Sequence, residues 1–326
     1  MSKISTSIMA VGIAAAAFTF AMPAAQADSW PSRPIRMVVG FGAGGGTDII
    51  ARLVAQPLSE VLGQPVVVEN KPGAGGTIGA DTVAKAAKDG YSIFMMNNGH
   101  AVSASLYKSL PYQSAKDFAP VSLVATMPLI ITANKDLPVA DLKALVTRAK
   151  AEPNKLRFAS VGVGSTQHFV GAVFATMAGV QIRHVPYRGT PAAIAATRSG
   201  EVELLVEVAS PLIGQIKGGE LKALAVSSAE RYEVLPNVPT VAEAGIKGFD
   251  ISTWYGLAFP AGTPVDIVNK MNAAINRAVT TDSARKQILD ASFIPASNTP
   301  SQFAAHLDAE IARWGKVMQE AGVQQQ

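Results

Sequence analysis

The sequence contains no cysteine, and this absence excludes several kinds of site at once. Disulfide bonds, thiolate metal ligands and cysteine nucleophiles cannot occur in it. The folded state must therefore be stabilised by a hydrophobic core. A chain of 326 residues with 48% hydrophobic residues is long enough for one or two core-bearing domains, and its composition is not that of a disordered protein.

Several signatures of other function classes are also missing. Lysine and arginine are scattered and the formal net charge is only +4, so nothing in the sequence indicates nucleic-acid binding. The four histidines lack the His-Glu-x-x-His spacing of a zinc site, and no Gly-Lys-Ser/Thr triplet marks a phosphate loop. Phe158 stands where a nucleophile elbow around Ser160 would need glycine. We therefore predict a protein that is not an enzyme and holds no cofactor or metal.

Long apolar runs are absent after the N-terminus, where residues 1–27 read as a cleaved signal peptide. Lys3 is followed by an almost wholly apolar run, Ile8 to Met22, and then by the small-residue cleavage signal Ala25-Gln26-Ala27. A membrane anchor is the rival interpretation, but the run is short for a span. The sequence thus predicts export, most simply to a bacterial periplasm.

What the sequence does have is an alternation of strand-like and helix-like segments, which predicts an α/β architecture. The first set of segments includes expected strands at 35–39, 66–69 and 91–96, and a second set of similar size begins near residue 138. We expect the C-terminal helices to return to the first set. The predicted division is lobe 1 at residues 28–126 plus 253–326 and lobe 2 at residues 127–252, with both crossings as candidate hinges.

Two glycine-rich turns each follow an expected strand and open an expected helix. One spans residues 40–48, the other 158–166, and a third glycine-rich turn occupies 72–76. Such a turn presents free backbone N–H groups and the positive end of a helix, a combination that binds anions. Two such turns far apart in the chain suggest two lobes that close on one small anion.

The chain resembles the Bug family, the periplasmic solute-binding proteins of tripartite tricarboxylate transporters. The resemblance covers essentially all of residues 30–323, and the motifs that carry it are Phe41-x-x-Gly44-Gly45-x-x-Asp48, Gln64–Gly76, Asp89-Gly90-Tyr91, Pro186–Gly189, Leu221–Val226, Pro239–Gly245 and Pro260–Pro264. It implies a two-lobed periplasmic-binding-protein fold of type II-like architecture, with a ligand cleft between α/β lobes. It also implies that the two glycine-rich loops hold a ligand carboxylate, partly through ordered water.

The first loop supplies candidate ligand-binding residues. The backbone N–H groups of Gly45, Gly46 and Thr47 are the candidate carboxylate donors, and Phe41 is a candidate apolar wall. Asp48 is included in the candidate site, but a carboxylate repels an anion, so its alternative role as the cap of the following helix is favoured.

The second loop supplies Gly164, Ser165 and Thr166 as the opposing half of the predicted cradle. Their hydroxyls can either cap the helix or donate to a ligand, and the resemblance favours the ligand. His168, in the first turn of that helix, is either a donor to the cleft or a packed histidine.

Five further candidates lie at the ends of expected strands. Asn97 and Asn98 end one strand, where α/β folds commonly bind ligands, although Asn-Asn-Gly also forms turns. Tyr187 and Arg188 follow another strand, and Arg188 is either a carboxylate ligand or a surface arginine. Glu207 lies in an apolar segment and either accepts a hydrogen bond from the ligand or simply ends the strand.

The predicted partners are a small organic carboxylate and the membrane subunits of a tripartite tricarboxylate transporter, with the protein itself a monomer. Two alternatives stay open. An exported protein of this kind can also act as a ligand sensor that feeds a receptor kinase. Gly40-x-Gly42-x-x-Gly45 with Glu69 after the next strand also matches the fingerprint of a dinucleotide-dependent enzyme, although Phe41 would stand inside its pyrophosphate turn.

Overall fold

The computed structural model describes residues 30–320 and residue 325, so the predicted signal peptide lies outside the described residues. The strands are β1 (Ile35–Val39), β2 (Val66–Asn70), β3 (Ser92–Asn97), β4 (Phe118–Asn134), β5 (Arg157–Ser160), β6 (Arg183–Pro186), β7 (Leu204–Val208), β8 (Leu221–Val226), β9 (Ser252–Pro260) and β10 (Ile294–Pro295). The helices are α1 (Gly46–Leu62), the 3₁₀ turn η1 (Ala74–Gly76), α2 (Thr77–Ala84), α3 (Asn98–Leu106), α4 (Leu142–Ala151), α5 (Thr166–Ala178), α6 (Thr190–Arg198), α7 (Ala209–Lys217), α8 (Val265–Thr280), α9 (Asp282–Asp290) and α10 (Pro300–Glu320).

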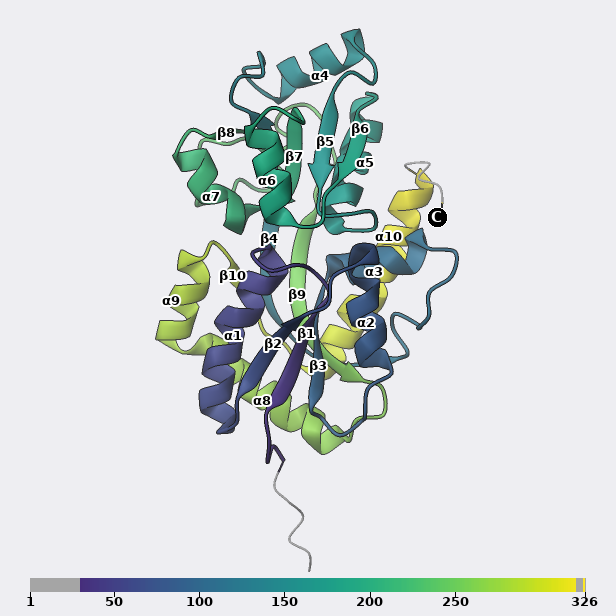
Figure 1. Ribbon diagram of the computed structural model, residues 1–326, viewed down its shortest axis with the longest axis vertical. Helices are drawn as coiled ribbons and strands as arrows, with labels where there is room; N and C mark the ends of the chain where they lie inside the picture. The colour runs from purple at the N-terminus through teal and green to yellow at the C-terminus, as the bar shows by residue number, and fades with distance from the viewer. Residues whose placement is uncertain (1–29, 321–324, 326) are drawn as a thin grey trace, which may run out of the picture.

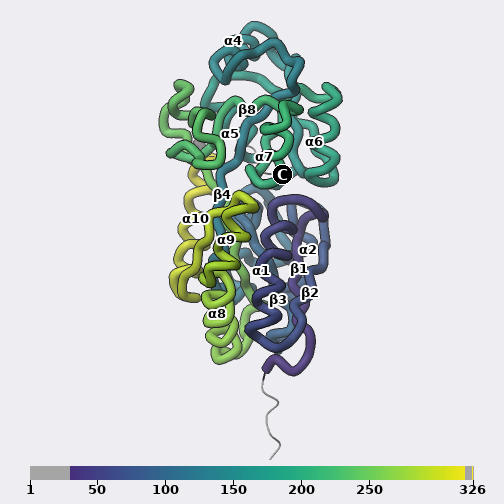
Figure 2. The backbone as a smooth tube through the Cα atoms, turned by 90° about the vertical axis from the view of Figure 1, so that its left-hand side faces the viewer, coloured from purple at the N-terminus to yellow at the C-terminus, as the bar shows by residue number. Residues whose placement is uncertain are grey.

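The elements form two α/β lobes, one below the other in Figure 1. In the lower lobe β1 pairs in parallel with β2 and β3, and β9 and β4 add antiparallel strands. In the upper lobe β5 pairs in parallel with β6 and β7, and β4 pairs with β7 and β8. The helices α8, α9 and α10 lie with the lower lobe, as expected for a C-terminal segment that returns to the first set (Figures 1 and 2).

Strand β4 belongs to both lobes. Residues 118–128 pair with β9, whereas Leu129 to Ala133 pair with β7 on one side and, from Ile130 onward, with β8 on the other. The change of partners falls between Pro128 and Leu129, and β9 begins opposite Pro128 at Ser252. The two lobes are thus joined through continuous backbone that is hydrogen-bonded on both sides of the crossing.

The core follows from the buried strands. β1 and β3 are parallel neighbours with apolar residues on both faces, and Met37, Val38, Ile93 and Met96 are fully buried, because helices cover both faces of a parallel sheet. Helix α1 ends at Gly63, whose φ of 65° is the left-handed conformation that glycine adopts without strain. Among the described residues, no helix is both long enough and apolar enough to cross a bilayer.

Candidate ligand-binding site

A cavity of about 500 Å³ lies between the two lobes. Its walls come from the ends of strands and the starts of helices in both lobes, and from β9, which leads from one lobe to the other. The lining residues are Gly40, Phe41, Gly42, Gly45, Gly46, Thr47, Pro72 to Gly76, Asn97, Tyr107, Val161, Gly162, Val163, Thr166, Gln167, Tyr187, Arg188, Gly189, Thr190, Val208, Thr253 and Tyr255.

The lower wall contains the N-terminus of α1. Its N-cap residue is Gly45, and no side chain within residues 30–320 caps the helix there. The first helical bond runs from the Ile49 N–H to the Gly45 carbonyl, so the N–H groups of Gly46 and Thr47 precede the intrahelical ladder. The Thr47 hydroxyl accepts a hydrogen bond from Asn97 Nδ2 at 3.0 Å. Uncapped N–H groups and the positive helix end therefore face the cavity.

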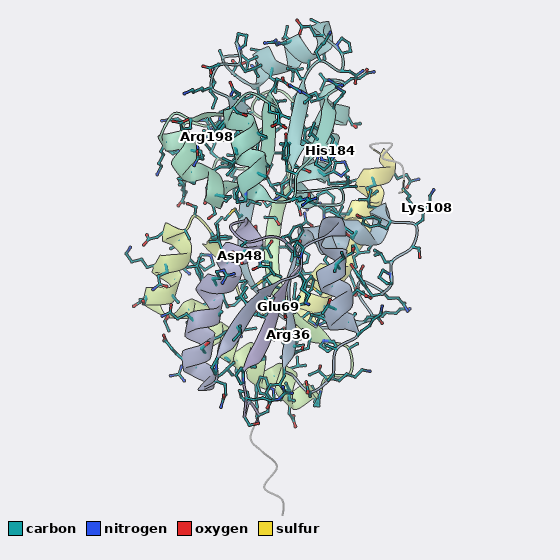
Figure 3. All side chains as sticks on the ribbon, viewed as in Figure 1. Arg36, Asp48, Glu69, Lys108, His184 and Arg198 are labelled. Carbon is teal, nitrogen blue, oxygen red and sulfur yellow. The ribbon has the colours of Figure 1, made fainter. Side chains whose placement is uncertain are left out.

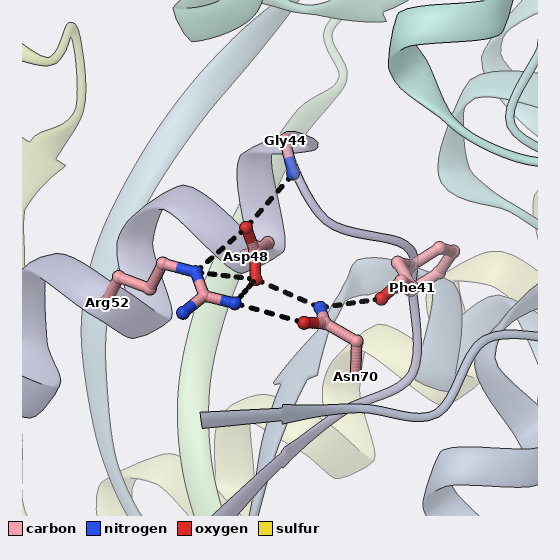
Figure 4. A network of polar contacts seen from close by, with 5 residues as sticks. All are labelled: Phe41, Gly44, Asp48, Arg52 and Asn70. Atoms are coloured by element: carbon pink, nitrogen blue, oxygen red, sulfur yellow. Dashed lines mark hydrogen bonds and ion pairs between the residues drawn. The ribbon is translucent and has the colours of Figure 1, made fainter. Parts of the chain in front are cut away.

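Asp48 fastens this first loop from behind and does not line the cavity (Figure 4). Its carboxylate accepts from the Gly44 N–H at 3.0 Å, from Asn70 Nδ2 at 2.9 Å and from Arg52 Nε at 3.0 Å. Asn70 Nδ2 also donates to the Phe41 carbonyl at 3.0 Å. Burial alone raises the pKa of Asp48, but the hydrogen bonds from Arg52, Gly44 and Asn70 outweigh it and leave that pKa below its ordinary value. Asp48 is thus a loop-holding anion, and the N-cap position belongs to Gly45.

The upper wall contains the N-terminus of α5, where two neighbouring hydroxyls differ. Ser165 is fully buried: its Oγ donates to the Gly162 carbonyl at 2.7 Å and accepts from the His168 N–H at 3.2 Å. Ser165 therefore caps the helix and has no place in the cavity wall. Thr166 does line the cavity, and its Oγ1 is buried without a hydrogen-bond partner in the described part of the chain. A buried hydroxyl without a partner is costly unless a ligand or water completes it.

A pair of histidines contacts the residues of the upper loop. The rings of His168 and His184 stack with centroids 4.1 Å apart, and His184 Nε2 lies 2.6 Å from Ser160 Oγ. Burial, and then the neighbouring His168, lowers the pKa of His184 to about 3, and burial also lowers the pKa of His168. Both rings are neutral near pH 7. Sequence analysis left two roles open for His168, a donor to the cleft or a packed histidine. The structure favours packing, since His168 is not in the cavity wall.

Arg188 is the charged side chain in the described cavity wall, and it forms no ion pair or hydrogen bond with the rest of residues 30–320. Tyr187 beside it turns its hydroxyl outward to donate to Glu201 at 2.8 Å, so its ring forms the wall. The cavity therefore combines helix N-termini with the Arg188 guanidinium, which is unpaired among the described residues, and this combination favours an anionic ligand.

Glu207 is fully buried behind the wall and does not reach the cavity, unlike the interpretation that placed it in the cleft. Its Oε1 accepts from Gln167 Nε2 at 2.6 Å and from the Val208 N–H at 2.8 Å, and its Oε2 accepts from Thr190 Oγ1 at 2.7 Å. Burial raises the pKa of Glu207, and these three hydrogen bonds work against the rise. Glu207 acts on the wall through the side chains of Gln167 and Thr190.

The lobes also touch directly beside the cavity. A Cβ on Gly75, which has a φ of 65°, would lie 2.8 Å from Gly164 C, and one on Gly45 would lie 3.0 Å from Thr190 Oγ1. Gly164 packs against Tyr107, and a Cβ on Gly164 would lie 2.6 Å from the Tyr107 hydroxyl. Gly164 does not line the cavity. Glycine at these positions is what permits the loops of the two lobes to approach so closely.

Sequence analysis found part of the wall. The predicted residues that line the cavity are Phe41, Gly45, Gly46, Thr47, Asn97, Thr166, Tyr187 and Arg188, and those that do not are Asp48, Asn98, Gly164, Ser165, His168 and Glu207. Asn98 is buried and accepts a hydrogen bond from Trp314 Nε1 at 2.6 Å.

Several lining residues were not predicted. The third glycine-rich turn, Pro72 to Gly76, could have been predicted to line the cavity, because it too follows a strand and opens a helix. No feature of the sequence indicated that Tyr107, Thr190 and Tyr255 line the cavity. Tyr255 comes from the strand that returns between the lobes, and its hydroxyl would be 2.8 Å from a Cβ on Gly46.

The geometry does not support the alternative of a dinucleotide-dependent enzyme. Glu69 does not line the cavity, and its carboxylate pairs with Arg36 at 3.3 Å and Lys71 at 3.0 Å. Figure 3 shows Glu69 and Arg36 low in the lower lobe, below Asp48. In the described ranges no group of three or more His, Asp or Glu side chains is arranged to hold a metal ion.

Comparison with known proteins gives a consistent result. Residues 50–323 match the family described as tripartite tricarboxylate transporter family receptor. Protein BugT of Bordetella pertussis is 37% identical over 314 residues, which is 96% of each chain, and a protein of the tcbD–tcbE intergenic region of Pseudomonas sp. strain P51 is 39% identical over 95% of this chain and 92% of its own.

Two solved structures of similar proteins are described with a bound ligand, and a third is described as a periplasmic binding protein. Rpa4515 of R. palustris with adipate has a TM-score of 0.88 at 36% identity and covers 91% of this chain and 100% of its own. MatC of Rhodopseudomonas palustris with bound malate has a TM-score of 0.83 at 34% identity and covers 88% and 99%. The periplasmic binding protein BugD has a TM-score of 0.87 at 35% identity, with coverage of 91% and 100%.

Proposed function

Because the chain belongs to the tripartite tricarboxylate transporter receptors, the Bug family, we propose that it captures a small organic carboxylate in the interlobe cavity for such a transporter. The observation that carries this proposal is that Thr166, whose hydroxyl is buried without a partner among the described residues, lines the same cavity as the uncapped N-terminus of α1. Both are donors without acceptors, and a carboxylate is an acceptor with about four lone-pair sites.

In this proposal the ligand carboxylate lies between the two helix N-termini. The N–H groups of Gly46 and Thr47 approach it from the lower lobe, and Thr166 approaches it from the upper lobe, directly or through water. Arg188 supplies the free positive charge for a second acidic or polar group of the ligand. Dicarboxylates are the class found in two similar structures, with adipate and with malate.

The division into lobes gives the capture step. We take residues 28–126 plus 253–326 as lobe 1 and 127–252 as lobe 2, with the crossings of β4 and β9 as hinges. Opening would separate the Gly75 turn from the Val163–Gly164 segment that it touches here, and the face formed on closure would be read by the membrane subunits. The protein would act in the periplasm after cleavage of residues 1–27, as a monomer and without catalysis.

Titration calorimetry with the purified protein tests this function. A panel of di- and tricarboxylates, aromatic acids and acidic amino acids should include at least one ligand that binds and raises the melting temperature by mass action. Thr166→Val should weaken its binding about tenfold through loss of one hydrogen bond to a charged group. The matched control is Thr147→Val, an exposed threonine on α4 that bonds only to the Lys143 carbonyl.

Two results would contradict the proposal. Absence of binding by every carboxylate would remove the function itself. Equal affinity of the Thr166→Val variant and the wild type would instead remove the upper loop from the site.

A further inference from the structure

Glu207 is surrounded by donors. The three hydrogen bonds that it receives, from Gln167 Nε2, Thr190 Oγ1 and the Val208 N–H, satisfy both carboxylate oxygens. Gln167 Nε2 and the Val208 N–H can only donate, and with the Thr190 hydroxyl donating as well, the partner set is that of an ionised carboxylate. The side chain lies near the starts of α5 and α6, whose positive ends favour an anion.

The direction of these hydrogen bonds decides which donors and acceptors the cavity wall presents to a ligand. Thr190 has one hydroxyl proton, and it is given to Glu207, so the lone pairs that remain on Thr190 Oγ1 can only accept. Gln167 presents its NH₂ group to Glu207, which leaves its Oε1 as the free acceptor end of the amide. Both residues line the cavity. A fully buried residue thus leaves the Thr190 hydroxyl with acceptor capacity alone and turns the NH₂ end of Gln167 toward itself.

This acceptor patch lies beside the carboxylate cradle. Thr190 Oγ1 would be 3.0 Å from a Cβ on Gly45, the N-cap residue of α1, and Gln167 directly follows Thr166 in the first turn of α5. A ligand carboxylate held by the two helix N-termini therefore has Thr190 and Gln167 next to it. The carbon attached to that carboxylate is the part of the ligand that these acceptors face.

We propose that Glu207 is a positioning residue which makes this receptor select carboxylates with a hydroxyl or amine donor on the carbon next to the carboxylate. An unsubstituted carboxylate leaves the two acceptors without a donor, whereas a 2-hydroxy or 2-amino carboxylate completes them. This inference rests on the proposed function, since it names the class of carboxylate within it.

Matched ligand pairs test the inference: malate with succinate, 2-hydroxyglutarate with glutarate, and aspartate as the amino form. The wild type should bind the substituted member of a pair at least about tenfold more tightly, the worth of about one hydrogen bond. In Glu207→Gln the new amide can donate to Thr190 Oγ1 and free its hydroxyl proton, so the ratio should fall to about twofold or less. A merely structural role for Glu207 would weaken both members equally and leave the ratio unchanged.

A second pair of variants covers the case in which Glu207→Gln does not fold. Thr190→Val removes the acceptor and should lower affinity for malate but not for succinate, whereas Thr190→Ser should keep the wild-type ratio. Equal wild-type affinity for both members of a pair, or binding of unsubstituted carboxylates alone, overturns the inference and leaves the proposed function standing. Failure of every carboxylate to bind would instead overturn the proposed function.

Discussion

The loops before α1 and α5 both line the cavity, but different side chains hold them in place. The lower loop is held by an ionic network, in which Asp48 joins Gly44, Arg52 and Asn70. The upper loop is held by neutral groups: the Ser165 cap and the stacked pair of His168 and His184. Figure 3 shows Asp48 in the lower lobe and His184 in the upper one.

The difference teaches that the two walls of one cavity can be stabilised by two kinds of side-chain network. A carboxylate behind the lower loop costs little there, because Arg52 neutralises its charge and two further donors, the Gly44 N–H and Asn70 Nδ2, hydrogen-bond to it. The upper loop instead depends on histidines that must stay uncharged. The two halves should therefore fail under different conditions, and the following experiments separate them.

The largest effect is expected from Asp48→Ala, which removes the centre of the lower network. We expect a loss of about 3 kcal/mol in the free energy of unfolding, from several charge-assisted hydrogen bonds, together with strongly reduced ligand affinity. Urea unfolding and calorimetry measure the two quantities. The control is Asp290→Ala, which breaks an ion pair of the same i,i+4 spacing between exposed side chains, 74% and 63% exposed, and should cost less than about 0.5 kcal/mol. Similar losses for both variants would contradict the assigned role of Asp48.

Acid should weaken the upper loop before the lower one. The folded-state pKa of His184 is about 3, against 6.5 for the unfolded side chain, so only the unfolded chain takes up this proton as the pH falls below about 6.5. Stability is therefore lost from pH 6.5 downward, by about 2 kcal/mol near pH 4.5 after allowance for partial exposure. Asp48, whose pKa is lowered, loses its contribution only as the pH falls below about 4.

Comparison with His184→Gln isolates this contribution, because His100, with its pKa lowered to about 4 by burial, titrates in the same range in both proteins. Unfolding at pH 7 and at pH 4.5 should show a smaller difference for the variant. An identical difference in both proteins would show that His184 is not a source of acid sensitivity.

The contact between the lobes should be broken by Gly75→Ala. Gly75 and Gly63 share a φ of 65°, so alanine at either position should cost about 1–2 kcal/mol of stability. A Cβ at Gly63 meets nothing within 4 Å, whereas one at Gly75 meets the backbone of Gly164. Only Gly75→Ala should therefore also lower ligand affinity, by about tenfold for lost closure. Calorimetry on both variants checks this, and equal affinities would argue that the loops need not meet.

The smallest effect is expected from Ser165→Ala, which removes the cap of α5. The loss should be about 1 kcal/mol of stability, with a several-fold loss of affinity because the Thr166 hydroxyl is no longer held in place. Asp141→Ala removes the cap of α4, far from the cavity, and is the control. It should cost similar stability without any change in affinity. If Ser165→Ala behaves in the same way, the cap and the site are independent.

Much of the fold follows from local pattern. The sequence predicted the buried strand at Ile35–Val39, the helix that ends at Gly63 and the return of the C-terminal helices to the first lobe. These features depend on the alternation of strand-like and helix-like segments and on glycines at their ends, which are properties of short segments. Strand β4 was not predicted. Pro120 and Pro128 interrupt the usual pattern of a central strand, and the strand exists because it finds partners in both lobes.

The candidate site divides in the same way. Glycine-rich turns before helices revealed Gly45, Gly46 and Thr166, since free N–H groups at a helix start are a local consequence of the chain. The sequence also revealed hydroxyls and carboxylates near them, but not which way they point. The Ser165 hydroxyl donates to the Gly162 carbonyl just before its own helix. The hydroxyl of the next residue, Thr166, has no hydrogen-bond partner among the described residues.

The sequence by itself determined the α/β class, the two glycine-rich turns before helices and the family, because these depend on residue order over short distances. The tertiary structure alone decided that Glu207 lies behind Gln167 and Thr190, that Asp48 faces away from the cavity, and that Tyr255 enters it from the returning strand. Hydrogen-bond direction and burial depend on groups brought together from distant parts of the chain. No spacing within one segment records them.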